Sequence, residues 1–116
     1  MNIYCDGSGY NGRTSGYCVI RGDYIERKIY EKRYTNNEME WEAMIQALKI
    51  AESGDTVYSD SQLVVNQITG NWKIKESHLI PYADEGKTLL RSKRGVSVKW
   101  IPREQNDAGI YIERHF

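Results

Sequence analysis

The chain has 116 residues, with 40% hydrophobic and 28% charged residues, which is the size and composition of one ordinary domain. Its 16 Lys and Arg residues balance 16 Asp and Glu residues, whereas a protein that binds nucleic acid purely by counterion release would be more basic. No apolar run approaches the length of a membrane span and no signal peptide precedes the first strand pattern, so we expect a cytoplasmic protein without membrane contact.

The first third of the chain predicts three strands of an antiparallel meander. Residues 2–6 alternate in polarity, and strand patterns follow at 16–22 and 24–34 after short loops. Cys5 and Cys18 occupy the first two strands as small apolar residues. Two cysteines form neither a disulfide framework nor a zinc pattern, so we expect free thiols in a reducing compartment.

The clearest helical pattern follows, over about 37–52. Its apolar residues form one stripe at helical spacing, and Glu38 and Glu42 lie on the opposite side. Glu40 lies on the flank of the stripe, where a carboxylate needs a partner or a metal. Taken alone, a Glu in such a place more often lays its stem along the core and extends its tip to water.

The second half of the chain alternates strands and helices. A strand at 56–59 ends at Asp60, and a helix follows at once. A second helix is expected at about 78–93, a strand at 96–101, and a short helix from about 106 to the end. Because a strand–helix–strand crossover makes strands parallel, the order predicts an α/β fold. Its mixed five-stranded sheet has three antiparallel strands and then two parallel ones, flanked by helices on both faces.

Three carboxylates from distant positions meet at one edge of this predicted sheet. Asp6 ends the first strand, Asp60 ends the fourth, and Glu40 lies near the start of the helix that crosses between them. Asp6 could instead be a turn residue and Asp60 a helix cap. Because clustered carboxylates repel one another, their coincidence indicates a hard divalent cation, Mg²⁺ or Mn²⁺, with oxygen ligands.

Four segments together resemble the type 1 ribonuclease H family, in its short form without a basic protrusion. They are Tyr4-Cys5-Asp6-Gly7-Ser8, Thr35-Asn36-Asn37 with Glu40 and Ala43, Tyr58-Ser59-Asp60-Ser61-Gln62, and Trp100-Ile101-Pro102-Arg103-Glu104 with Asn106. Their order and spacing cover essentially the whole chain. The resemblance implies a ribonuclease H-like fold in one domain over residues 1–116, and with Met1 in place we expect a free-standing protein.

The resemblance also implies an activity, which is hydrolysis of the RNA strand of an RNA–DNA hybrid with two Mg²⁺ ions, or Mn²⁺ as a substitute. Asp6, Glu40 and Asp60 would be catalytic metal ligands. The residues that would bind the hybrid are Gly7, Ser8, Asn11, Thr35, Asn36, Asn37 and Gln62. We expect the protein to act as a monomer.

The fourth acid that the family usually carries at the start of its last helix has two candidate positions, Asn106 and Asp107. Counted from Asn106, the positions that face the sheet in the family are small or apolar: Ala108, Gly109 and Ile112. Counted from Asp107, they include Glu113. We therefore expect Asn106 to be the fourth catalytic and metal-binding residue, with Asp107 as the alternative. An Asn carbonyl oxygen can ligate a hard cation, and Asn106 could also be a helix cap.

Two other functions stay open. The Asn at the fourth position is compatible with a catalytically weakened module that binds hybrids without cutting them. The strand-end carboxylates are also compatible with another ribonuclease H-like nuclease, of the exonuclease or resolvase type.

The connector at 72–77 keeps only Lys73 and Lys75 of the basic insertion that some members carry, so we expect weaker binding of the hybrid.

Overall fold

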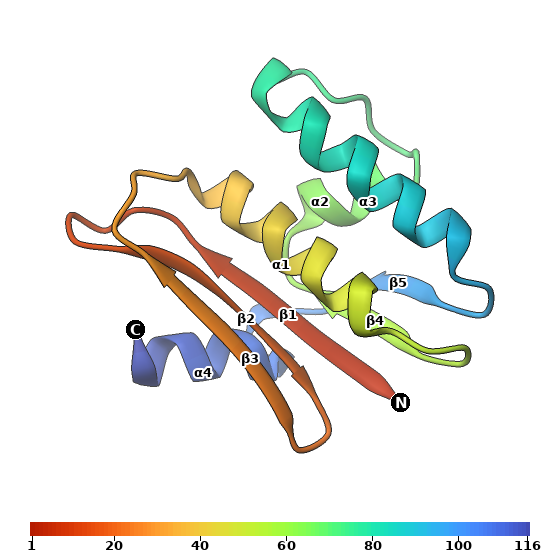
Figure 1. The fold of residues 1–116 in the computed structure, drawn as a ribbon, viewed down its shortest axis with the longest axis horizontal. Coiled ribbons are helices and arrows are strands. Elements are labelled where there is room, and N and C mark those ends of the chain that lie inside the picture. Colours follow the sequence, from red (N-terminus) through yellow and green to blue (C-terminus); the bar gives the residue numbers. More distant parts are fainter.

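The computed structural model describes all 116 residues as a five-stranded sheet with helices on both faces (Figure 1). The strands are β1 (Asn2–Ser8), β2 (Ser15–Arg21), β3 (Tyr24–Tyr30), β4 (Thr56–Ser59) and β5 (Ser97–Trp100). The α-helices are α1 (Asn36–Ile50), α2 (Gln62–Ile68), α3 (Ile80–Ser92) and α4 (Asp107–His115), and short 3₁₀ turns span Ser77–Leu79 and Arg103–Gln105. None of these helices is both long enough and apolar enough to cross a membrane.

The strand order is β3-β2-β1-β4-β5. β1 pairs with β2, and β2 with β3, in antiparallel register, whereas β1, β4 and β5 run parallel to one another. The element order and the mixed sheet predicted from the sequence are therefore confirmed. The parallel half of the sheet is made by two crossovers, through α1 and through α2 with α3.

The two faces of the sheet bury unequal cores. The larger core lies under α1, and its buried members include Ile3, Val19, Trp41, Leu48 and Val57. The Trp41 indole N–H donates to the Gln67 side chain at 3.0 Å, so its only polar group is satisfied inside the core. The smaller core lies under α4 on the other face, and its fully enclosed members are Cys18, Ala108 and Ile112.

The start of α1 is fixed tightly against β1. Thr35 Oγ1 accepts from the Glu38 N–H at 3.1 Å, and the Glu38 carboxylate accepts from the Thr35 N–H at 2.9 Å, which is a capping box. A Cβ atom on Gly7 would overlap the Met39 carbonyl group. Because glycine leaves this contact open, α1 can bring Glu40 directly onto the strand.

Two strand boundaries differ from those expected. β1 does not end at Asp6 but continues to Ser8, because Asp6, Gly7 and Ser8 keep their pairing with β2. Asp6 therefore lies inside the ladder, opposite Cys18. β3 ends at Tyr30, several residues early, because its partner strand β2 begins at the residue opposite Tyr30.

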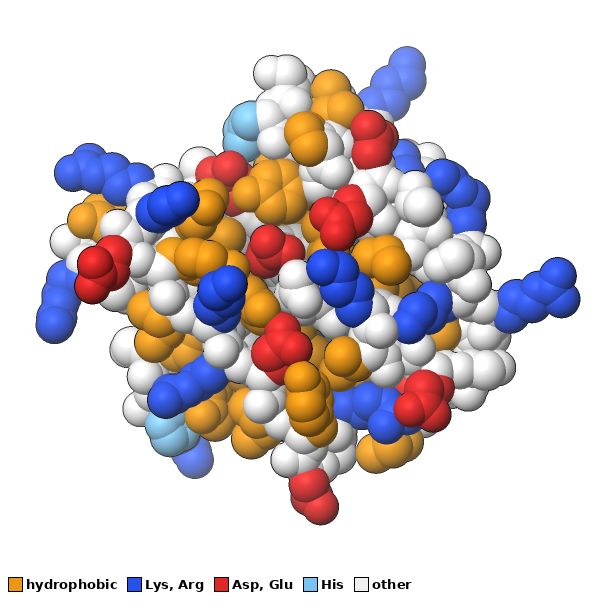
Figure 2. Space-filling view, in the orientation of Figure 1, with side chains coloured by type: hydrophobic (Ala, Val, Ile, Leu, Met, Phe, Trp, Pro, Cys, Tyr) orange, Lys and Arg blue, Asp and Glu red, His pale blue; other side chains and the backbone are white.

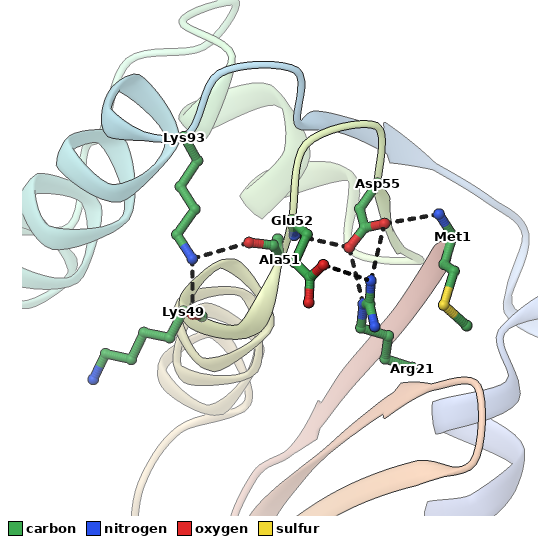
Figure 3. Close-up of polar contacts among 7 residues, drawn as sticks. All are labelled: Met1, Arg21, Lys49, Ala51, Glu52, Asp55 and Lys93. Atoms are coloured by element: carbon green, nitrogen blue, oxygen red, sulfur yellow. Dashed lines mark hydrogen bonds and ion pairs between the residues drawn. The ribbon is translucent and has the colours of Figure 1, made fainter.

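The far end of the sheet is held by a buried ion cluster (Figure 3). Asp55 accepts from the Met1 amino group at 2.7 Å, from Arg21 Nε at 2.9 Å and from the Glu52 N–H at 2.9 Å. Beside it, Lys93 Nζ donates to two carbonyl groups at the C-terminal end of α1, at 2.8 and 3.0 Å. A cation at this end complements the helix dipole. These contacts join β1, β2, α1 and the approach to β4.

Candidate metal centre and active site

Three carboxylates lie together where β1, α1 and the end of β4 meet. One oxygen atom each from Asp6, Glu40 and Asp60 lies within 4.8 Å of the others. Asp6 and Glu40 are only 2% and 6% exposed, and Asp60 is half-buried. The fold therefore brings together three acids that are separated by 34 and 20 positions in the chain. We call them the carboxylate cluster.

Each member of the cluster is held by its own local structure. Glu40 Oε1 accepts from the Gly7 N–H at 2.6 Å, in the contact that the missing side chain of Gly7 makes possible. Asp60 follows β4, and the cap of α2 is Ser61, whose hydroxyl accepts from the Val64 N–H at 3.2 Å. Because Ser61 provides the cap, the Asp60 carboxylate is left for the cluster.

The electrostatics of the cluster favour a cation. Burial raises the pKa of Asp6 to about 6, and the charge of Asp60 adds to this rise. The pKa of Glu40 is raised well above its usual value, first by burial and then by the charge of Asp6. Asp6 Oδ1 and Asp60 Oδ2 are buried without any hydrogen-bond partner. An all-oxygen donor set with unpaired buried atoms fits a hard divalent cation.

Arg103 places a positive charge near these acids. Its guanidinium pairs with Glu113 at 3.4 Å. Burial lowers the pKa of Arg103, but the charges of Asp6 and Asp60, together with the contact to Glu113, raise it above its usual value. The sequence did not indicate that Arg103 lies near these acids, because the position of its loop depends on how α4 packs on the sheet.

Asn106 lies beside the cluster and has both of its polar groups in use. Its Oδ1 accepts from the Ala108 N–H at 3.2 Å as the cap of α4, and its Nδ2 donates to the Cys5 carbonyl at 3.0 Å. It is completely buried, so it joins α4 to β1 next to Asp6. Because an amide oxygen has two lone pairs, Asn106 Oδ1 can hold this cap and still offer a lone pair to a cation. Asp107 is exposed in the first turn of α4 and is outside the cluster.

The residue of α4 that approaches the cluster is Gly109. A Cβ atom at this position would lie 3.2 Å from Asp6 Oδ2 and 3.6 Å from Asp60 Oδ2. Position 109 therefore lies against the cluster and carries no side chain. The sequence did not single out Gly109 as a site residue because glycine has no ligating group.

The residues expected to bind the hybrid flank the three acids. Gly7 and Ser8 follow Asp6 in β1, Thr35, Asn36 and Asn37 begin the turn before Glu40, and Gln62 opens α2 just after Asp60. The side-chain amides of Asn37 and Gln62 form no hydrogen bond within the protein, and Gln62 is exposed. These two amides are therefore available to a ligand.

The remaining hybrid-binding candidates already have internal contacts. Asn36 Oδ1 accepts from the Gly9 N–H at 3.2 Å, and Asn11 Oδ1 accepts from the N–H groups of Arg13 and Thr14 at 3.0 Å. The Gly7 N–H is already donated to Glu40. These contacts order the β1–β2 loop and the start of α1.

A surface hollow of about 520 Å³ lies along the connector that follows α2. Trp72, Lys73 and Lys75 line it, together with Leu63 and Gln67. Trp72 is 47% exposed, so about half of its surface is open to a ligand. An exposed aromatic ring in the same hollow as two lysines suits the sugar and phosphate groups of a nucleic-acid strand.

The chain matches the RNase H family model over residues 1–109. A bifunctional protein of Mycobacterium tuberculosis is 33% identical over 110 residues, a match that covers 86% of this chain but 30% of that protein. The chain thus spans less than a third of the length of this relative. Ribonuclease HI of Helicobacter pylori is 36% identical over 112 residues, covering 87% of this chain and 78% of that enzyme.

A similar fold occurs in a solved complex. LC11-RNase H1 bound to an RNA/DNA hybrid matches with a TM-score of 0.73 and 26% identity. The match covers 91% of this chain and 88% of that one.

Proposed function

Because the chain belongs to the RNase H family, we propose that it is an endonuclease that hydrolyses the RNA strand of RNA–DNA hybrids. The observation that carries this proposal is the carboxylate cluster, with its two unpaired buried oxygen atoms. The hybrid bound to LC11-RNase H1 supports the same substrate class. We further propose that residues 1–116 act as one RNase H domain in the cytoplasm, a compartment that agrees with two free buried cysteines.

For the metal, we propose two Mg²⁺ ions, with Mn²⁺ as a substitute, held by Asp6, Glu40 and Asp60, with Asn106 Oδ1 as the fourth ligand. The all-oxygen set of ligands supports a hard cation. When bound, such ions lower the pKa of a water molecule and stabilise negative charge on the phosphate group. Asp6 would supply its oxygen to this set alongside Glu40 and Asp60, because the ligand oxygens of the three acids lie within 4.8 Å of one another.

The surrounding residues position these acids. The Gly7 N–H orients the Glu40 carboxylate, and Asn106 fixes β1 at the carbonyl group just before Asp6. The positive charge of Arg103 favours the ionised form of Asp6. A rigid surround keeps the ligand oxygens in place before metal and substrate arrive, which lowers the reorganisation that catalysis needs.

Substrate choice is proposed to rest on the 2′-hydroxyl groups and on the groove shape of the hybrid. Asn36, Asn37 and Gln62 are assigned to the minor groove, and their positions next to Glu40 and Asp60 support this assignment. Gly7 and Ser8 are assigned to the RNA strand, and Thr35 and Asn11 to a phosphate of the DNA strand. For Gly7, contact with the RNA would have to come from atoms other than its N–H.

The affinity for the hybrid is proposed to be low. Figure 2 shows Lys and Arg side chains spread over one face of the molecule rather than gathered into one patch. The formal net charge is zero. Trp72, Lys73 and Lys75 in the hollow provide one local contact to the backbone of the duplex.

A second candidate is a module that binds hybrids without cutting them. It is favoured by α4, which contributes no acid to the cluster, since Gly109 faces it and Asn106 is engaged in its cap. Cleavage and binding assays separate the two candidates.

The experiment is cleavage of an end-labelled RNA–DNA hybrid, with RNA duplex, DNA duplex and single-stranded RNA as substrate controls. It is run in Mg²⁺, in Mn²⁺ and in chelator. We expect metal-dependent cutting of the RNA strand in the hybrid alone. The cleavage rate of Asp6→Asn should fall by more than about 100-fold. Removing a residue that only supports a metal ligand costs up to about 100-fold, and Asp6 is itself proposed as a ligand.

Asp84→Asn is the matched control, because Asp84 is an exposed aspartate of α3 outside the cluster, and this variant should cut at the parent rate. Hybrid binding without cutting in either metal would replace the nuclease by the binding module. Equal cutting by Asp6→Asn and the parent would reject the cluster as the active site.

A further inference from the structure

The strand β3 forms an open edge of the sheet (Figure 1). It pairs with β2 on one side only, and no helix packs extensively against it. Three of its side chains are among the most exposed large hydrophobic residues of the protein: Tyr24, Ile25 and Ile29, at 49%, 47% and 46%. An open edge with exposed apolar residues is a template for another strand.

The β2–β3 hairpin determines which backbone groups face that edge. Arg21 and Tyr24 flank a two-residue turn whose first residue, Gly22, has a φ of 60°. In such a hairpin the flanking residues form a hydrogen-bonded pair, and hydrogen-bonded pairs then recur at every second residue. The N–H and C=O groups of Ile25, Arg27 and Ile29 therefore point to the open side.

The sequence of β3 is nearly symmetric about its centre. It reads Tyr24-Ile25-Glu26-Arg27-Lys28-Ile29-Tyr30, with opposite charges on either side of Arg27. If a second copy pairs antiparallel around Arg27, Tyr24 lies opposite Tyr30, Ile25 opposite Ile29, and Glu26 opposite Lys28, and each pair occurs twice. Directly opposed pairs of this kind stabilise antiparallel strands.

Other registers lack this complementarity. Because the outward groups belong to alternate residues, a two-fold axis can pass through Glu26, Arg27 or Lys28, but not between them. An axis through Glu26 places two Glu side chains opposite each other, and an axis through Lys28 places two Lys side chains opposite each other. Only the axis through Arg27 forms two opposite-charge pairs and two isoleucine pairs. In that register Arg27 faces its own copy, and its long side chain can extend into water.

We propose that β3 is a self-association surface, on which a second copy of this chain pairs antiparallel around Arg27 to form an isologous dimer with one continuous sheet. Figure 2 shows hydrophobic side chains interspersed with both signs of charge over the region where Figure 1 draws β3. A two-fold axis perpendicular to the sheet leaves α1 of both copies on one face and α4 of both on the other.

The dimer is weak and leaves the active site open. A single pair of strands gives an interface at the small end of the size range, typical of transient complexes. The carboxylate cluster is centred on β1, which β2 separates from β3, so pairing does not cover it. Self-association departs from the monomer expected from the sequence, and it does not depend on the proposed nuclease function.

The test is sedimentation of the whole chain from micromolar to millimolar concentration. We expect a reversible monomer–dimer equilibrium. Either Glu26→Lys or Lys28→Glu places two side chains of like charge opposite each other in both pairs of positions 26 and 28. Each variant should therefore weaken dimerisation by about tenfold or more. The double variant, Glu26→Lys with Lys28→Glu, restores both opposite-charge pairs and should recover dimerisation.

A mixture of the two single variants provides a sharper test. In a heterodimer, the two lysines of the Glu26→Lys copy lie opposite the two glutamates of the Lys28→Glu copy. The mixture should therefore dimerise, although each variant alone does not. Glu26 also accepts hydrogen bonds from the hydroxyl groups of Tyr17 and Tyr24, so circular dichroism must first show that each variant is folded.

A parent chain that stays monomeric at millimolar concentration would overturn the proposal. So would folded single variants whose mixture remains monomeric. Hybrid cleavage by the monomeric variants, measured in parallel, tests the nuclease function separately, because neither Glu26 nor Lys28 belongs to the active site.

Discussion

The protein buries two aspartates at opposite ends of its sheet, and their surroundings are opposite in kind. Asp55 is 3% exposed and accepts hydrogen bonds from a guanidinium, an amino group and a backbone N–H. The Arg21 guanidinium, first among these partners, holds the pKa of Asp55 well below its usual range. Asp6 is 2% exposed, has one oxygen without a partner, and has its pKa raised to about 6 by burial.

The difference separates a structural carboxylate from a ligand-binding one. Burial alone is nearly the same for Asp55 and Asp6, so burial does not identify a site. Asp55 has its charge and lone pairs satisfied by the protein, whereas Asp6 and its neighbours place several negative charges together without enough donors. Repulsion among the carboxylates of the cluster lowers the stability of the folded protein, and a bound cation restores it.

The largest effect on stability is expected from Asp55→Asn. This change removes the negative charge between Arg21 and the Met1 amino group, and should lower the free energy of unfolding by about 3 kcal/mol. Chemical denaturation measures the loss. Hybrid cleavage per folded molecule should stay at the parent rate, because Asp55 is remote from the cluster. A loss of less than about 0.5 kcal/mol would mean that the ion cluster is not structural.

The pH dependence of stability in chelator should show both aspartates with opposite signs. Asp6 has a raised pKa in the folded state, so its contribution is present below its ordinary value of 3.8 and is lost as pH rises to about 6. Asp55 has a lowered pKa, so its contribution is present above 3.8 and is lost as pH falls below that value. The effect of each is on the order of 1–3 kcal/mol.

Unfolding curves of the parent, Asp6→Asn and Asp55→Asn across this pH range measure the two contributions. In Asp6→Asn, the free energy of unfolding should decline less between about pH 4 and 6 than in the parent. In Asp55→Asn, it should fall less below about pH 4. Identical profiles for the two variants would remove the contrast between the sites.

Asn106→Asp tests whether this residue is a cap or a ligand. An aspartate keeps the acceptor for the Ala108 N–H but cannot donate to the Cys5 carbonyl, and it brings a further negative charge near Asp6. We expect the free energy of unfolding to fall by about 1–2 kcal/mol, because the Cys5 carbonyl loses its donor, and cation affinity to rise, because the proposed fourth ligand gains a charge. Titration of Mn²⁺ into both proteins measures affinity, and a tighter site in Asn106→Asp would support the ligand role expected from the sequence.

Gly109→Asp should add the missing fourth acid at the position that faces the cluster. In chelator the extra charge should lower stability by about 1 kcal/mol, whereas cation affinity should rise roughly tenfold with one more charged ligand. Gly109→Ala is the matched control, because its Cβ meets the same contact with Asp6 without adding charge. If both variants change affinity alike, crowding rather than ligation explains the result.

The sequence predicted the elements of the fold because their patterns are local. The helical stripe around Trp41 and the crossover rule were sufficient for the antiparallel and parallel halves of the sheet. The convergence of Asp6, Glu40 and Asp60 followed from that topology. Their positions as active-site residues remain a prediction until cleavage is measured.

Other features depend on packing that the sequence does not display. The close contact of Gly7 with α1, the approach of Gly109 to the cluster and the use of Asn106 in two hydrogen bonds all arise from how α1 and α4 lie on the sheet. The network of Asp55 joins residues from three separate segments and was not foreseen. Distances of this kind need coordinates, because residue type and spacing alone do not specify them.

The most direct test of the central claim is the thermal stability of the metal-free protein as Mg²⁺ or Mn²⁺ is added at neutral pH. We expect a concentration-dependent rise in Tm for the parent and for Asp55→Asn, and no rise for Asp6→Asn. In chelator, Asp6→Asn should be at least as stable as the parent, since the substitution removes a repelled charge. A parent Tm that does not respond to either cation, or an equal response by Asp6→Asn, would contradict the assignment of the carboxylate cluster as a metal centre.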